Sequence, residues 1–325
     1  MSVPAVPRDQ PYLHLLHDVA FRPVFIIGEH RSGTTILYKL LAATGLFNYV
    51  TYYHITHSNE LLHNRICQQE AAAKEALQAR FATLNLEDRG FDQIRVTPDL
   101  PEEYSFVLKR GASLWYVPRL ARRNLPQFMT FCRKVQFIAG NDKPLLLKNP
   151  WDAANFLFLR QTFPNAHFIF IHRHPVYAIN SKLKAVRSIL AARNPYSALL
   201  DPAYARLFDR PGQLRLARAL FPSFGDLDLR ILTRLAINWT RYFLRNYNRI
   251  PAGNQVSIQY ETLCARPGES INQIIQALNL PPHQGNYESW INPRPLKLLP
   301  PIVRHKARIQ RRLAPYMAYN QYAPL

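Results

Sequence analysis

Two hydrophobic periodicities alternate along the 325-residue chain. Short apolar runs of the kind that form strands occur at 24–27, 48–55, 144–148, 167–171 and 255–260. Between them lie longer stretches whose apolar residues recur every three or four positions, as on one face of a helix. Strands that alternate with helices favour a parallel sheet covered on both faces. The pattern therefore predicts an α/β fold of three layers, with a central parallel β-sheet flanked by helices.

Several segments allow a more specific prediction. The run 48–55 is rich in aromatic and β-branched residues and suits a second strand or an extended loop. Dense alanine and helical spacing over 60–84 predict one long helix. Residues 190–228 are basic and interrupted by prolines, so we expect a loop-like, variable insertion that faces the substrate. With 1–22 as an N-terminal lead-in, residues 23–325 are expected to form a single domain.

The first strand leads into a polar loop with Gly28 and Gly33 and then into a helix-spaced run. The first N–H groups of a helix lack intrahelical partners and the helix dipole favours negative charge there, so this order predicts an anion site. An ordinary turn with a solvated Arg31 is the alternative. The loop departs from G-x-x-x-x-G-K-[ST], because Thr34 occupies the lysine position. Arg31 supplies the positive charge instead, and γ-phosphoryl transfer is not favoured.

The net charge limits the class of partner but does not identify one. The chain has 41 Lys and Arg against 21 Asp and Glu, a formal net charge of +20. This excess either only solubilises the protein or predicts an anionic partner: a nucleotide, a sulfated or phosphorylated substrate, nucleic acid or membrane headgroups. Three widely spaced cysteines are typical of a reducing compartment. Because no secretory or membrane-spanning run is visible, we expect a cytoplasmic protein, with peripheral membrane contact left open.

Ligands of parallel sheets collect beyond the carboxyl ends of the strands. The polar residues expected there are the Arg31-to-Thr35 loop, Lys148, Arg173 and Tyr260. Arg173 ends the 167–171 strand, and Ser181 lies on the helix that follows. Arginine is well suited to a phosphate, so Arg173 and Ser181 together would grip one phosphate group.

Three blocks of this sequence resemble sulfotransferases that use 3′-phosphoadenosine 5′-phosphosulfate. They are the loop with Arg31-Ser32-Gly33-Thr34-Thr35, the segment 163–181, and the 256–261 strand with its tyrosine and glutamate. The resemblance implies in-line transfer of a sulfuryl group to an acceptor hydroxyl or amine, on a P-loop-like fold. It also implies a donor site made of Arg31, Ser32, Gly33, Thr34, Thr35, Arg173, Ser181 and Tyr260. Arg31 and Lys148 would stabilise the charge that develops during transfer, and no metal is expected.

The sequence offers more than one candidate for the general base. Cytosolic members of that family place a histidine two residues after a lysine like Lys148, but this chain has Pro150 there. Two candidates remain, His54 and Glu60. His54 is preferred because an unperturbed histidine, with a pKa of about 6.5, suits proton transfer near neutral pH. Glu102 and Glu103 are expected to be helix-start charges only.

Two other functions compete with sulfuryl transfer. A P-loop kinase-like phosphotransferase is disfavoured by the missing loop lysine and by the lack of an evident magnesium-binding carboxylate. A non-enzymatic binder of nucleic acid or of a membrane surface would account for the charge but not for the ordered phosphate blocks. Because no nucleic-acid module is recognisable, we expect no nucleic-acid partner. A small molecule, a glycan or a lipid remains open as acceptor.

Overall fold

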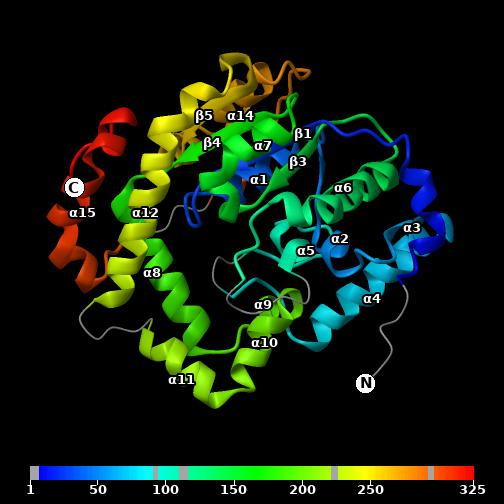
Figure 1. Cartoon of the computed structure of the whole chain (residues 1–325), viewed down its shortest axis with the longest axis horizontal. Helices are drawn as coiled ribbons and strands as arrows, with labels where there is room; N and C mark the ends of the chain where they lie inside the picture. Colours follow the sequence, from blue (N-terminus) through cyan, green and yellow to red (C-terminus); the bar gives the residue numbers. More distant parts are fainter. Residues whose placement is uncertain (1–6, 91–93, 110–115, 221–225, 292–295) are drawn as a thin grey trace.

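Figure 1 shows the central sheet of the computed structural model with helices on both sides. The structure describes residues 7–90, 94–109, 116–220, 226–291 and 296–325. Its five strands are β1 (Pro23–Ile27), β2 (Asn48–Tyr49), β3 (Leu145–Lys148), β4 (His167–His172) and β5 (Gln255–Gln259). All pairings are parallel, in the order β2-β3-β1-β4-β5. The prediction of an α/β fold with a central parallel sheet is confirmed.

Strand β1 lies at the centre and separates two apolar clusters. Phe25 and Ile27 point to one face, where they pack with residues of α6 (Leu125–Ala139) and α7 (Phe156–Thr162). Val24 and Ile26 point to the other face, towards α1 (Thr34–Ala43), α13 (Tyr260–Ala265) and α14 (Pro267–Ala277). Every residue of β1 is buried, which explains why the strand reads as a continuous apolar run.

A third apolar cluster joins three helices at one end of the sheet. These are α8 (Pro175–Ala191), α12 (Leu227–Asn246) and α15 (Pro300–Tyr319), which pack on one another through residues such as Ile179, Ile237 and Leu313. Helix α8 follows β4, so this cluster fixes the position of the side chains on its first turns. In the described part of the chain, no helix is both long and apolar enough to cross a membrane.

The structure corrects three predictions of secondary structure. Strand β2 has only two residues, because Thr51 caps a helix, α2 (Tyr52–Thr56), inside the expected strand. The expected helix over 60–84 is two helices, α3 (Leu61–Ile66) and α4 (Glu70–Thr83). Gln68 separates them with a left-handed backbone, φ 57°. The helix whose start was expected at Glu102 and Glu103 begins later, as α5 (Ser105–Lys109), so both acids precede it.

The loop prediction for 190–228 is also wrong. This segment forms α9 (Pro195–Leu200), α10 (Pro202–Phe208) and α11 (Pro211–Leu220), while 221–225 lies outside the described residues. The prolines begin these helices rather than interrupt them, since a first-turn proline loses no intrahelical hydrogen bond. The side chain of Asn194 caps α9, and that of Asp201 caps α10.

Of the expected lead-in, residues 1–6 lie outside the described part of the chain. The rest forms a 3₁₀ helix, Gln10–Leu16, next to α3 and α6. Buried Asp9 precedes this helix and pairs with Lys134 of α6 at 2.6 Å. The lead-in is therefore fastened to the rest of the described fold.

Candidate functional site

The loop between β1 and α1 has the backbone that an anion site requires. Gly33 precedes α1 with φ 100°, and a Cβ there would lie 2.2 Å from Cδ2 of Tyr260. Only glycine fits such a conformation and such a close approach. Arg31 also has a left-handed backbone, φ 69°, which is unusual for a residue with a side chain and is found often at ligand sites.

Helix α8 holds the loop in this shape. The hydroxyl and the N–H of Ser32 both donate to the Glu29 carbonyl oxygen, at 2.8 and 3.1 Å. The Glu29 carboxylate pairs with Lys182 at 2.7 Å, and Arg31 Nε donates to the Ser181 hydroxyl at 3.1 Å. Two consecutive residues of α8 thus fix the loop from one side, and two of the predicted donor-site residues, Arg31 and Ser181, are in direct contact.

Arg173 follows β4 and lies across the same loop. Its Nη1 donates to the Arg31 carbonyl oxygen at 2.8 Å, and its guanidinium lies 4.3 Å from the centre of the Tyr260 ring. Its Nε is buried without a hydrogen-bond partner in the described structure. A buried cationic N–H that lacks an acceptor fits an anion such as a phosphate. Glu261 supports this turn by accepting from the backbone N–H of His174 at 2.9 Å.

Lys148 ends β3 on the other side of the loop. Its ammonium donates to the Thr35 hydroxyl at 3.0 Å and pairs with Glu103 Oε1 at 3.0 Å. The side chain of Lys148 is 1% exposed and that of Glu103 is 14% exposed. The parallel sheet therefore brings residues from four strand ends to one edge, together with a carboxylate that the sequence analysis assigned elsewhere.

Glu103 is the functional candidate that sequence reasoning missed. Burial would raise the pKa of its carboxyl, but Lys148 and then His30 outweigh burial, so the pKa lies below its ordinary value. Its neighbour Glu102 is fully buried and accepts a hydrogen bond from Tyr196 of α9. Neither acid is merely a helix-start charge. The one sequence signal was the position of both acids between Leu100 and Tyr104, in a chain with few acids.

His54 and Glu60 have other surroundings. His54 Nδ1 accepts from the Thr51 N–H at 3.1 Å, and its own backbone N–H donates to the Thr51 hydroxyl, which closes the start of α2. Burial, and then Lys74, lower the pKa of His54 to about 3, so the expected value near 6.5 is wrong. Glu60 lies 3.6 Å from Arg8 and 3.9 Å from His57. Within the described residues, none of these contacts includes the loop.

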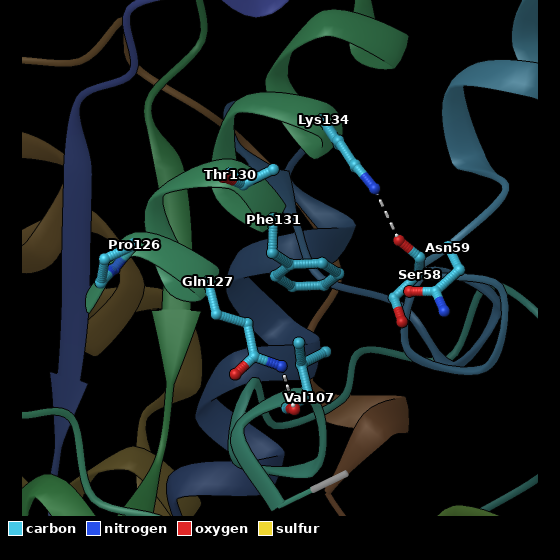
Figure 2. A pocket seen from close by; sticks show the side chains of 8 residues that line it. All are labelled: Ser58, Asn59, Val107, Pro126, Gln127, Thr130, Phe131 and Lys134. Carbon is cyan, nitrogen blue, oxygen red and sulfur yellow. Dashed lines mark hydrogen bonds between the residues drawn. The ribbon is translucent and has the colours of Figure 1, made fainter. Parts of the chain in front are cut away.

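A cavity of about 300 Å³ lies apart from the loop (Figure 2). It is lined by Ser58, Asn59, Val107, Pro126, Gln127, Thr130, Phe131 and Lys134. The Lys134 ammonium donates to the Ser58 carbonyl oxygen at 2.9 Å and also pairs with Asp9. Gln127 donates to the Val107 carbonyl oxygen at 3.0 Å. The lysine and the glutamine of this cavity are thus bonded to the protein itself.

The fold and the loop define a P-loop-like α/β protein with a candidate anion site at the strand ends. A model of the sulfotransferase family matches residues 23–219, and the chain belongs to that family. It is a sulfotransferase, an enzyme that transfers a sulfuryl group. No curated protein matches the chain significantly.

Two solved structures show the same fold. Sulfotransferase STF9 from Mycobacterium avium has a TM-score of 0.59 and 17% identity, covering 96% of this chain and 79% of that one. Sulfotransferase STF1 from Mycobacterium tuberculosis H37Rv has a TM-score of 0.54 and 16% identity, covering 96% and 80%.

Proposed function

We propose that the protein transfers the sulfuryl group of 3′-phosphoadenosine 5′-phosphosulfate to an acceptor hydroxyl or amine. The observation that carries this proposal is the set of cations, from the ends of several strands, that surrounds one loop. Arg31 and Lys148 lie with the start of α1, where N–H groups favour an anion, while Arg173 lies on Tyr260 with a buried, unpartnered Nε. A nucleotide with separate 5′ and 3′ anionic groups matches such an arrangement.

In this proposal each residue of the loop has a defined task. Gly33 to Thr35 hold the 5′-phosphate through backbone N–H groups and the threonine hydroxyls, while Ser32 keeps the loop in shape by donating to Glu29. Arg173 and Ser181 hold the 3′-phosphate, and Tyr260 fixes the guanidinium plane of Arg173. The bond from Arg31 Nε to Ser181 joins the two phosphate positions, which keeps their spacing constant.

The donor supplies a sulfuryl group whose bond to the phosphate oxygen breaks as a new S–O or S–N bond to the acceptor forms. The acceptor's proton passes to a base, and adenosine 3′,5′-bisphosphate leaves. Arg31 and Lys148 would stabilise the negative charge on the leaving phosphate oxygen. Such a transfer needs no covalent intermediate with the protein. The protein therefore contributes mainly by positioning the reactants and by stabilising charge.

We propose Glu103 as the base in place of His54 or Glu60. The lowered pKa keeps its carboxylate ionised, so it can accept a proton, and its pairing with Lys148 holds it beside the loop. His54 is a weaker candidate because its Nδ1 already accepts from the Thr51 N–H and its contacts within the described residues do not include the loop.

We further propose that the segment 190–228, which is helical over much of its described part, faces the acceptor within a single domain. Its link to the site runs through α9, where Tyr196 donates to Glu102, the residue next to Glu103. Lys109 of α5 pairs with Asp201, between α9 and α10. These two contacts join the proposed acceptor segment to Glu102, just before α5, and to the last residue of α5.

Turnover with the sulfate donor tests the proposal. Purified protein is incubated with 3′-phosphoadenosine 5′-phosphosulfate and a panel of phenols, alcohols, amines and glycans. We expect adenosine 3′,5′-bisphosphate and a sulfated product, measured by mass spectrometry. Phosphorylated products from ATP with magnesium, without any sulfated product, would contradict it.

A further inference from the structure

The exposed sides of α12 and α15 carry most of their cations in two stripes. The arginines of α12 are spaced by four or seven residues, which places them on one side of that helix. The arginines of α15 are spaced by one, three or four residues and cover a somewhat broader part of one side. These eight residues are exposed and are called the arginine face: Arg230, Arg234, Arg241, Arg245, Arg304, Arg308, Arg311 and Arg312.

Acidic residues hardly offset this charge. Helix α15 contains no Asp or Glu, and the one acid of α12, Asp228, is fully buried and bonded to Arg187 at 2.8 Å. Asp226, before α12, lies 3.4 Å from Arg304, which remains 68% exposed. The side chains of the other seven arginines of the face make no hydrogen bond or ion pair within the described structure, so their charge is available to a partner.

The two helices that carry the arginine face run side by side. Near their starts, Asp226 accepts from His305 of α15 at 2.9 Å, and near their ends Phe243 contacts Tyr319 at 5.3 Å between ring centres. Figure 1 shows this pair at one end of the molecule. Twenty residues of helix span about 30 Å. Their inner sides are packed in the cluster with α8, so the arginine face is a fixed feature of the fold.

Apolar side chains are exposed on the same two helices. Leu235 is 54% exposed, Val303 is 58% exposed, and Leu227 and Tyr319 are also solvent-accessible. Single exposed apolar residues are ordinary on a protein surface. Leu235 follows Arg234 and Val303 precedes Arg304, so each lies about 100° around its helix from that arginine and borders the arginine face. An apolar border beside mostly unpaired arginines is typical of a surface that lies in the interface of an anionic lipid bilayer.

We propose that the arginine face docks the protein on anionic lipid headgroups. The arginines contact lipid phosphates, while Leu235 and Val303 enter the boundary between headgroups and acyl chains. A nucleic acid would satisfy the arginines but offers the aliphatic side chains no apolar environment, so the lipid surface fits better. The inference does not depend on the identity of the sulfuryl donor or of the acceptor.

Vesicle co-sedimentation tests this inference. The full chain is mixed with vesicles of phosphatidylcholine alone or with added phosphatidylglycerol. We expect binding only to the anionic vesicles, weakened by salt. A variant with Arg230→Gln, Arg234→Gln, Arg241→Gln and Arg245→Gln should lose affinity by a factor on the order of 10² to 10³. A second variant changes the arginines of α15 and should lose affinity to the same extent: Arg304→Gln, Arg308→Gln, Arg311→Gln and Arg312→Gln. It provides the same test if the α12 variant does not fold.

A matched control changes the same number of exposed cations elsewhere: Arg65→Gln, Arg80→Gln, Arg95→Gln and Lys143→Gln. This control should bind anionic vesicles within a few-fold of the wild type. The variant Leu235→Ser with Val303→Ser, which keeps every charge, should weaken vesicle binding but leave binding to duplex DNA unchanged. An equal loss of vesicle binding in the control and in the arginine variants would overturn the inference. Binding of the wild type to duplex DNA but not to anionic vesicles would also overturn it.

Discussion

The Lys148 ammonium lies 3.0 Å from the Glu103 carboxylate. Lys148 ends a strand of the sheet, whereas Glu103 lies just before α5, some 45 residues earlier. The pair is mostly buried, so neither charge is strongly screened by water. It places a carboxylate that can take up a proton next to the cation that contacts the Thr35 hydroxyl.

Replacing Glu103 by glutamine tests its assignment as the base. We expect Glu103→Gln to lower kcat by at least about 100-fold, the usual effect of losing a general base. The affinity for adenosine 3′,5′-bisphosphate should stay within a few-fold, because Arg173 and the loop are unchanged. The matched variant His54→Gln should keep most of its activity. If His54→Gln were inactive and Glu103→Gln active, the assignment would be wrong.

The 3′-phosphate site is tested by comparing two nucleotides. Arg173→Lys loses both the planar fork and the stacking on Tyr260, so we expect its affinity for adenosine 3′,5′-bisphosphate to fall about 10- to 100-fold. Adenosine 5′-monophosphate lacks the 3′-phosphate and should bind to both proteins equally. Titration calorimetry measures both. The exposed Arg193→Lys is the control, and an equal loss for both nucleotides would refute the 3′-phosphate assignment.

Replacing two glycines by alanine distinguishes the cost of a positive φ from the cost of a steric clash. Gly45 has φ 68°, and a Cβ added there would meet no atom within 4 Å, whereas Gly33 has φ 100° and the Tyr260 ring 2.2 Å from such a Cβ. We expect Gly45→Ala to lower the free energy of unfolding by about 1–2 kcal/mol. Gly33→Ala should lower it by more and should abolish nucleotide binding. Urea denaturation checks both, and equal effects would show that the Tyr260 contact is unimportant.

Buried neutral histidines predict the response of stability to acid. Burial lowers the pKa of His54 and of His172 to about 3 and that of His30 to about 4. Between about pH 6.5 and these values the unfolded chain binds protons that the folded chain does not. The free energy of unfolding should therefore fall as the pH falls through this window. Each histidine contributes at most about 1.4 kcal/mol per pH unit.

The comparison of wild type with His54→Gln isolates one of these groups. Urea denaturation at several pH values should give a shallower loss of stability for the variant than for the wild type. Parallel pH curves for the two proteins would mean that His54 is protonated in the folded state.

The sequence predicted the elements that a strong local signal specifies. Buried strands are continuous apolar runs, and parallel pairing brings their carboxyl ends to one edge, so the expected meeting of Arg31, Lys148 and Arg173 followed from topology. Gly33 and the missing lysine were visible in the loop itself. The match to the sulfotransferase family bears out the resemblance that these blocks suggested.

Tertiary packing decided what the sequence could not show. The run after Tyr49 has the composition of a strand, but Thr51 and His54 cap each other and begin a helix instead. Glu103 has no local signal for its role, because its partner Lys148 comes from a distant strand. His54 appeared suitable for proton transfer only as long as its burial was unknown, since burial lowers its pKa.

The most direct measurement for the proposed donor is the thermal stability of the protein with adenosine 3′,5′-bisphosphate and, separately, with ATP and magnesium. A ligand that binds only the folded state raises the melting temperature, and it does so more strongly the tighter it binds. We predict a clear rise with the bisphosphate, a much smaller one with ATP and magnesium, and no bisphosphate effect in Arg173→Ala. A rise with ATP and magnesium but none with the bisphosphate would contradict the proposed donor.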